Sequence, residues 1–305
     1  MRGLPPNSRL QILLLLALVP ICAAQKVAIT FDDLPLNGDL PAGVTRVEIV
    51  RNTLAVLKMR HAPATYGFVN GKKLEQNADA AEALKLWAAS EPVGSHTYSH
   101  MDLNANPAEA FEREIDEDEP VLELVARKDA NWRWFRYPFL REGDTAEKRR
   151  VVRAYLQAHQ YRVAQVTLDW EDYAWNSAYA HCMARNDAKS ITWLRSSYLG
   201  TASAYLDSGR EAAKLVFGHE INHVLLLHLG AFSSTILPDV LDMLKKKGFQ
   251  LVTLEEAESD LAYETDPDAG SKYGGTLLEQ WMDVKQIKYP ATAEKPLKEL
   301  QEVCK

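Results

Sequence analysis

The chain has 305 residues, of which 47% are hydrophobic and 25% are charged, and its formal net charge at pH 7 is −7. This is the composition of a globular protein with a sizeable core, either one domain of α/β-barrel size or two smaller domains. The acidic balance argues against nucleic acid and anionic membrane surfaces as partners.

The first residues have the pattern of a secretory signal peptide. Two arginines flank a short polar stretch, an almost wholly apolar run follows over residues 10–21, and small residues end at Ala24. A helix needs about 20 apolar residues to span a membrane, and this run is shorter. We therefore expect residues 1–24 to be removed and the mature chain to be exported to the periplasm, the cell surface or the medium, without a stable membrane span.

Beyond the signal peptide, short apolar runs alternate with helical patterns. This alternation predicts a βα architecture with a largely parallel sheet. We expect strands at residues 26–31, 64–69, 93–95, 134–137, 161–168, 222–227 and 249–254. We expect helices at residues 47–57, 79–89, 107–126, 145–159, 178–217 and 237–247. The simplest organisation is one barrel-like domain over residues 25–260 and a C-terminal extension, residues 261–305, that packs on the barrel or trails from it.

Two cysteines, Cys182 and Cys304, remain after removal of the signal peptide. An oxidising compartment would permit a disulfide between them. The sequence alone does not establish that the two residues meet.

Polar residues with possible chemical functions stand at the ends of five expected strands. They are Asp32 and Asp33, His96, Arg136, Asp169, and His228. In parallel βα folds the C-terminal ends of the strands converge on one face, where catalytic residues collect. The sequence therefore predicts one site that contains all of them.

Two histidines and a carboxylate in this set have the chemistry of a metal site. His96 and His100 are four residues apart, and a single helical turn would place both imidazoles on one face. With Asp33 they would form a two-histidine, one-carboxylate triad that leaves coordination positions open. Asp32 would then be free to act as a general base. Each feature also has a plain alternative, a structural histidine or an ordinary Asx turn.

These residues resemble five short motifs of the polysaccharide deacetylases, the family with the NodB homology domain that is also called carbohydrate esterase family 4. The five similar segments are residues 30–33 (Thr-Phe-Asp-Asp), 96–100 (His-Thr-Tyr-Ser-His), 136–139 (Arg-Tyr-Pro-Phe), 169–170 (Asp-Trp) and 225–228 (Leu-Leu-Leu-His). The resemblance implies a NodB-like, distorted (β/α) barrel of about seven largely parallel strands. It also implies the removal of acetyl groups from an N-acetylated glycan, such as a chitin- or peptidoglycan-like polymer or oligosaccharide.

The resemblance implies a role for each site residue. Asp32 would be the general base, oriented by Arg136, and His228 the general acid, oriented by Asp169. The metal ligands would be Asp33 and the histidines of the second motif. We expect zinc, and the same ligands would also accept cobalt, nickel or iron.

Four further residues are expected to contact the substrate. The backbone N–H of Phe139 would hold the oxyanion, and Trp170 would form a wall of the acetyl pocket, although a place in the core is the alternative for this large aromatic side chain. Tyr137 and Leu226 are expected beside them. Tyr137 and Leu140 depart from the usual third motif, which leaves the shape of the substrate open.

Other functions remain possible at this stage. His219 and His223 belong to a His-Glu-x-x-His segment of the kind that binds zinc in metalloproteases. That motif requires a helix, and Gly218 and the apolar strand that follows argue against one, so we expect both histidines to be exposed loop residues. The same barrel could instead hydrolyse O-acetyl esters, for example on xylan, or another small amide, or it could bind a glycan without catalysis.

Overall fold

The computed structural model describes residues 24–305, so the expected signal peptide lies outside the described part except for Ala24. Within residues 24–305, none of the helices is long and apolar enough to span a membrane.

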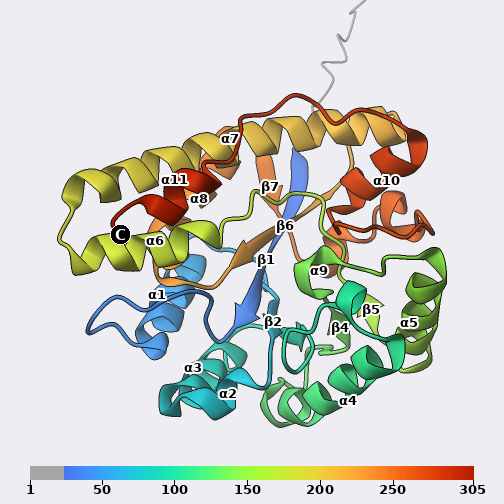
Figure 1. Ribbon diagram of the computed structural model, residues 1–305, viewed down its shortest axis with the longest axis horizontal. Coiled ribbons are helices and arrows are strands. Elements are labelled where there is room, and N and C mark those ends of the chain that lie inside the picture. Colours follow the sequence, from blue (N-terminus) through green and yellow to red (C-terminus); the bar gives the residue numbers. More distant parts are fainter. Residues whose placement is uncertain (1–23) are drawn as a thin grey trace, which may run out of the picture.

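A curled sheet of seven parallel strands forms the centre of the fold (Figure 1). The strands are β1 (Gln25–Leu34), β2 (Gly67–Val69), β3 (Val93–Ser95), β4 (Trp134–Phe135), β5 (Arg162–Val163), β6 (His223–His228) and β7 (Phe249–Leu251). Their order is β5-β4-β3-β2-β1-β6, and β7 also pairs with β1. Every pairing is parallel, which confirms the predicted distorted barrel.

The barrel is weakly joined between β5 and β6. The strand expected over residues 161–168 is regular only at Arg162–Val163. Further along, Leu168 forms an isolated parallel bridge with Leu225 of β6, and its carbonyl accepts the N–H of Leu226 at 3.0 Å. The segment after β5 therefore pairs with β6 over only a short stretch. We call this weakly paired place between β5 and β6 the seam of the sheet.

Helices surround the sheet. They are α1 (Arg46–Met59), α2 (Lys73–Gln76), α3 (Ala78–Ala88), α4 (Ala108–Val125), α5 (Ala146–Ala158), α6 (Ala174–Ala184), α7 (Ala188–Phe217), α8 (Ala231–Lys246), α9 (Leu254–Ala257), α10 (Leu277–Lys285) and α11 (Leu297–Glu302). The helix expected over residues 178–217 is two helices, because the chain turns at Asn186, whose φ is +53°, and Asp187 caps α7. The short helices α2 and α9 and the helices of the C-terminal extension were not predicted.

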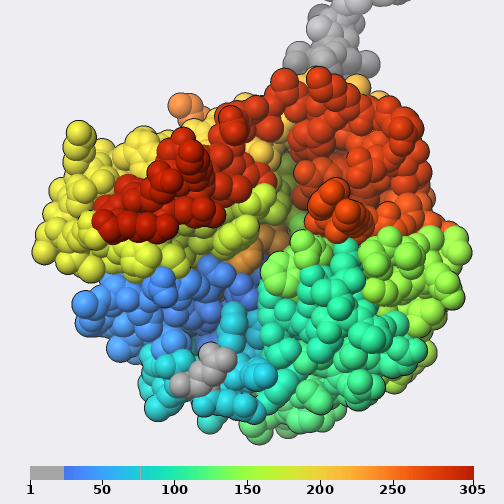
Figure 2. Space-filling model, in the orientation of Figure 1, coloured from blue at the N-terminus to red at the C-terminus, as the bar shows by residue number. Residues whose placement is uncertain are grey.

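The C-terminal extension packs on the barrel. Leu278 and Met282 of α10 are buried in an apolar cluster with Ala212 and Val216 of α7. After α10 the chain runs along α7 and ends at α11 beside α6 (Figure 1). In the space-filling view this orange-red and dark red part covers much of one face (Figure 2).

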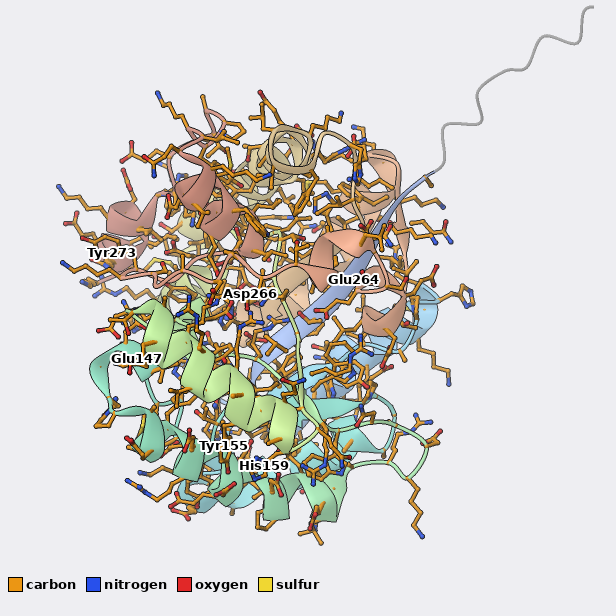
Figure 3. The ribbon with its side chains drawn as sticks, turned by 90° about the vertical axis from the view of Figure 1, so that its right-hand side faces the viewer. Glu147, Tyr155, His159, Glu264, Asp266 and Tyr273 are labelled. Carbon is orange, nitrogen blue, oxygen red and sulfur yellow. A yellow bond between two sulfur atoms is a disulfide. The ribbon has the colours of Figure 1, made fainter. Side chains whose placement is uncertain are left out.

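Covalent and ionic contacts fix both ends of the extension. Cys182 of α6 and Cys304 form a disulfide, which answers the question that the sequence left open. At the other end, the buried guanidinium of Arg149 in α5 donates to Asp266 and to Gln280, each at 2.8 Å. Figure 3 shows Asp266 next to α5. The extension is therefore held at two distant points of the barrel.

Candidate active site

The end of β1 presents two consecutive carboxylates to the same pocket. Asp32 is still paired with His228 of β6, so it belongs to the regular strand. Consecutive side chains of a strand point to opposite faces. Asp33, however, has a φ of +69°, and both Asp32 and Asp33 line the pocket. The local turn of the backbone at Asp33 thus allows neighbouring residues to act at one site.

The two expected metal histidines lie on an irregular loop after β3, and the expected helical turn is wrong. Thr97 and His100 have φ values of +61° and +63°, which a right-handed helix does not contain. The side chain of Asn70 holds this loop by donating to the carbonyls of His96 and Thr97 at 2.7 and 3.0 Å. The loop still brings the two imidazoles together, with ring centroids 4.8 Å apart.

Asp33, His96 and His100 have the geometry of a metal-binding triad. One potential ligand atom from each lies within 4.8 Å of the others, and Nε2 of His100 is 3.6 Å from Oδ1 of Asp33. Nδ1 of His96 lies 2.8 Å from the carbonyl oxygen of Arg136, a contact that leaves Nε2 free for a metal. Burial lowers the pKa of His96 to about 3 and that of His100 to about 4, so both rings are neutral near pH 7. The residues present fit a divalent ion.

Asp33 has two polar partners that the sequence did not reveal. Nζ of Lys73 lies 3.0 Å from Oδ1 of Asp33, and the side chain of Asn37 donates to Oδ2 at 2.7 Å. Burial alone would raise the pKa of Asp33, but Lys73 and the histidines lower it further than burial raises it. Neither Lys73 nor Asn37 belongs to a recognisable motif, so only the fold identifies them.

Asp32 lies beside Arg136, as expected. One guanidinium nitrogen of Arg136 lies 3.2 and 3.4 Å from the two carboxylate oxygens of Asp32. The rest of the guanidinium donates to the carbonyl of Ala164 and to the hydroxyl of Thr30. Burial raises the pKa of Asp32, and the charge of Arg136 opposes this effect. Asp32 is thus a buried, oriented carboxylate next to the metal triad.

The acidic partner of His228 is Asp172, and the expected pairing with Asp169 is wrong. Nδ1 of His228 is 2.7 Å from Oδ1 of Asp172, which also accepts the backbone N–H of His228. Asp169 instead accepts the backbone N–H of Glu171 at 2.7 Å. The reason is the turn between the two acids: Glu171 has a φ of +59°, and this turn carries Asp172 to His228. The sequence shows Asp172 three residues after Asp169, but it does not show that the side chain of Asp172 points toward His228.

The environment separates the pKa values of these groups. Burial alone would lower the pKa of His228, but the charge and hydrogen bond of Asp172 and the charges of Asp33 and Asp32 raise it to about 9. Burial raises the pKa of Asp169 to about 6. His228 is therefore protonated at neutral pH, which suits a proton donor.

Two of the expected substrate contacts are core residues. Trp170 is fully buried, with its ring 5.8 Å from that of Tyr198. Tyr137 is 2% exposed and packs between Phe111 and Phe135. Neither Trp170 nor Tyr137 lines the pocket, because the apolar clusters beneath it take up these large rings.

Two other expected contacts do reach the pocket. Phe139 is 53% exposed, and its ring centroid lies 4.4 Å from that of His100. Leu226 of β6 contributes to the floor between the catalytic groups. Tyr173, which was not predicted, is 43% exposed and lies 5.3 Å from the ring of His228. Exposed aromatic rings thus stand on both the metal side and the His228 side of the site.

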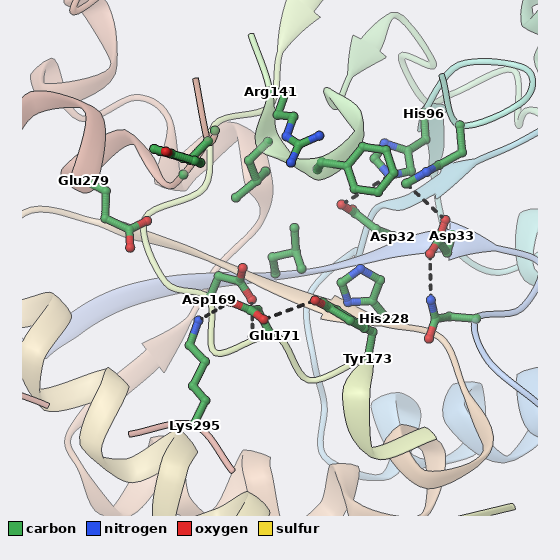
Figure 4. A pocket seen from close by; sticks show the side chains of 18 of the residues that line it. Asp32, Asp33, His96, Arg141, Asp169, Glu171, Tyr173, His228, Glu279 and Lys295 are labelled. Carbon is green, nitrogen blue, oxygen red and sulfur yellow. Dashed lines mark hydrogen bonds and ion pairs between the residues drawn. The ribbon is translucent and has the colours of Figure 1, made fainter. Parts of the chain in front are cut away.

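These groups surround a cavity of about 810 Å³ (Figure 4). The charged or titratable barrel residues that line it include Asp32, Asp33, His96, His100, Asp169 and His228. Nine of the 22 lining residues come from the C-terminal extension, between Tyr273 and Lys295. None of the five motifs lies in the extension, so its place in the pocket was not predicted.

The alternative zinc-protease site is wrong. His219 lies in a bend after α7, and His223 is the first residue of β6, so no helix presents the two imidazoles together. His223 is fully buried, against the expectation of an exposed loop residue, and its Nδ1 lies 3.1 Å from the hydroxyl of Thr167. Glu220 pairs with Lys214 at 2.8 Å. His223 is buried because it begins the buried strand β6 that the apolar residues after it form.

Solved structures of deacetylases resemble the chain. A chitin deacetylase from the fungal pathogen Colletotrichum lindemuthianum is 20% identical over 77% of this chain and 88% of the other, with a TM-score of 0.48. A polysaccharide deacetylase from Bacillus cereus is 18% identical over 75% and 91%, with a TM-score of 0.49. A pseudoenzyme of carbohydrate esterase family 4 from Bacillus anthracis is 14% identical over 77% and 65%, with a TM-score of 0.46. No curated protein matches the chain in sequence.

A family model matches slightly less than half of the chain. Residues 22–164 match the model described as polysaccharide deacetylase. This part contains the first three motifs, which supply Asp32, Asp33, His96, His100 and Arg136. The remaining two motifs lie beyond it but end in the same pocket. Residues 22–164 of the chain therefore match the polysaccharide deacetylase family.

Proposed function

We propose that this protein is a metal-dependent hydrolase that removes acetyl groups from an N-acetylated glycan. The observation that supports this most directly is the arrangement of the pocket. The triad Asp33, His96 and His100 lies beside the buried carboxylate Asp32, and the protonated His228 lines the same cavity. Hydrolysis of an amide needs these three functions: an electrophile, a base and an acid.

Asp33, His96 and His100 would hold one divalent ion, with zinc as our first choice. Two neutral imidazoles and one carboxylate are suitable ligands and leave positions open for other groups. A divalent ion held there would act as a Lewis acid toward the acetyl carbonyl and the attacking water. The hydrogen bond from Nδ1 of His96 to the carbonyl of Arg136 would fix the tautomer that leaves Nε2 for the ion.

Asp32 would take the proton from the attacking water. A base whose pKa is raised toward the working pH accepts a proton more effectively than an ordinary carboxylate, and burial raises the pKa of Asp32. Arg136 would keep this carboxylate ionised and oriented. The backbone N–H of Phe139, at the rim of the metal site, is our candidate donor to the oxyanion.

His228 would protonate the departing amine. Its raised pKa keeps the proton available at neutral pH, and Asp172 orients the ring through Nδ1. Nε2 of His228 would then deliver the proton to the departing amine. We assign the orienting role to Asp172 in place of Asp169.

We also infer that the mature chain is exported. The first 24 residues have the pattern of a signal peptide. The disulfide between Cys182 and Cys304 is consistent with an oxidising compartment, since disulfides are rare in the reducing cytosol.

Metal depletion and acetate release test this function. The mature chain is stripped with a chelator, and zinc, cobalt or nickel is added back before incubation with chitooligosaccharides, peptidoglycan and acetylated xylan. We expect no acetate from the stripped protein and recovery with metal on the N-acetylated substrates. Release from xylan alone would indicate an O-acetyl esterase. Absence of acetate from every substrate with metal restored would refute a deacetylase.

A further inference from the structure

The C-terminal extension forms one side of the pocket and touches the barrel on both flanks of the site. At one flank Gly274, with a φ of +78°, lies so close to the third motif that a Cβ there would be 2.7 Å from the carbonyl oxygen of Phe139 and 3.0 Å from that of Leu140. At the other flank Nζ of Lys295 lies 2.7 Å from Glu171. The segment therefore spans from the loop after β4 to the loop before α6.

Between these two contacts the extension covers the seam of the barrel. The N–H of Leu277 donates to the carbonyl of Val166 at 2.7 Å. Val166 lies in the segment that directly follows β5. The bridge between Leu168 and Leu225 links this segment to β6. The extension is thus hydrogen-bonded to the barrel at the place where β5 and β6 are weakly joined.

Residues 273–295, the part of the extension that lines the pocket and is called the wall below, are fixed in place by buried groups. Arg149 is fully buried and contacts Asp266, Gln280 and Glu142. Gln280 in turn donates to Glu142 at 3.0 Å. Removal of one partner from a buried ionic network of this kind is strongly destabilising, because it leaves the other charge buried and unpaired. The segment is thus a built part of the pocket and not a loosely attached tail.

The wall faces the catalytic centre across the cavity. Figure 4 shows Glu279 and Lys295 on the side of the pocket away from Asp33 and His96. The volume of about 810 Å³ lies within the range of about 300–1,000 Å³ that is usual for small-ligand sites. A long polymer needs an open channel on both sides of the unit that reacts, and residues of the extension stand on one side of this cavity.

We propose, on the basis of the function proposed above, that the segment 273–295 is part of the substrate site and restricts the substrate to short N-acetylated oligosaccharides and chain ends. The sugar unit that follows the reacting acetamide meets this wall. The interior of a long glycan cannot pass it.

Lys295 is the substrate-binding residue that the wall contributes. Its side chain is 17% exposed and lines the cavity, and its ammonium group lies 4.8 Å from the ring centroid of Tyr205. Glu171 accepts one of its three N–H groups. The ammonium is therefore held at a fixed position from which it donates to hydroxyl oxygens of the sugar.

The first test uses the unaltered, metal-loaded protein. Acetate release is measured from N-acetylglucosamine oligomers of one to six units and from a soluble long-chain polymer at equal acetyl concentration. We expect release per acetyl group to be at least tenfold faster from the oligomers. Mass spectrometry of the hexamer product should show deacetylation at one end of the chain. Equal or faster release from the polymer, or removal at internal units, overturns the inference and leaves the proposed function intact. No acetate from any glycan overturns both.

The second test isolates Lys295. The variant Lys295→Met keeps most of the side-chain volume and removes the charge, and we expect it to raise KM for the trisaccharide about tenfold with a much smaller change in kcat. Lys298→Met, at an exposed position on α11 outside the pocket, is the matched control and should keep the wild-type KM. Lys295→Arg should recover part of the loss. A KM for Lys295→Met equal to that of the control overturns the role of Lys295, and the chain-length profile is independent of whether this variant folds.

Discussion

Oδ1 of Asp172 lies 2.7 Å from Nδ1 of His228, and the same carboxylate accepts the backbone N–H of His228. A single buried acid therefore fixes both the orientation of the imidazole and its charge. Asp169, the acid that directly follows the strand-like segment after β5, has its hydrogen bond with the backbone of Glu171 instead.

The replacement Asp172→Asn should shift the pH dependence of the reaction. Burial lowers the pKa of His228, and without the charge of Asp172 the value of about 9 should fall toward or below its usual 6.5. The acid form acts as the proton donor, so activity is present below this pKa and is lost as pH rises through it. We expect the basic limb of the kcat/KM profile to move down from near pH 9, with a loss of roughly tenfold or more at pH 8.

Asp169→Asn is the matched control for this shift. Asp169 lines the same pocket but accepts the backbone N–H of Glu171, whereas Asp172 is the acid that is hydrogen-bonded to the ring of His228. The basic limb of the kcat/KM profile of Asp169→Asn should stay close to that of the wild type. Equal shifts in the two variants would contradict the assignment of Asp172 as the orienting acid.

Asp32→Asn and Asp33→Asn should separate catalysis from metal binding. Asp32→Asn removes the general base, and we expect a loss of about 10²-fold or more in kcat, with one metal ion per chain retained. Asp33→Asn removes a charged ligand of the triad and should reduce the metal content itself. Metal per chain is measured by elemental analysis after dialysis. Loss of metal from Asp32→Asn, with retention by Asp33→Asn, would mean that the two roles are exchanged.

The sequence predicted the parallel sheet and most of the residues of the site, because strand ends and motif spacing are local properties. Asp32 and His228 directly follow short apolar runs that favour buried strands, and parallel strands bring their ends together. Contacts that depend on the path of a loop were not predictable. The backbone turn at Glu171 decides which acid meets His228, and no local pattern shows its direction.

The C-terminal wall was unpredictable for a different reason. Lys295 reaches the pocket only because the chain runs over α7 and is tied down by the bond between Cys182 and Cys304. A contact between Lys295 and Glu171 spans 124 residues. Apolar spacing predicts which residues are buried, but it does not predict which distant segment covers an open seam.

Tyr137→Phe tests the conclusion that Tyr137 is a core residue. Its hydroxyl is buried and has no hydrogen-bond partner among the described residues. An unsatisfied buried hydroxyl costs about 1–3 kcal/mol, so its removal should leave the free energy of unfolding unchanged or increase it by up to this amount. Because the ring packs against Phe111 and Phe135, kcat and KM should stay at wild-type values. Urea unfolding and acetate release measure the two effects, and a clear rise in KM would return Tyr137 to the substrate site.

Reduction of the disulfide should destabilise the protein. Cys182 is fully buried on α6, and the bond to Cys304 closes a loop with a sequence separation of 122 residues. A cross-link of this kind restricts the unfolded chain, and its loss typically costs about 2–4 kcal/mol. For a domain of this size each kcal/mol corresponds to roughly 2–4 °C in Tm, so we expect the Tm to fall by several degrees when reductant is added. The double variant Cys182→Ser, Cys304→Ser should unfold at the lower temperature both with and without reductant. A wild-type Tm that does not respond to reductant, in a sample shown by thiol titration to be fully reduced, would mean that the noncovalent contacts of α10 and Arg149 hold the extension on the barrel without the disulfide.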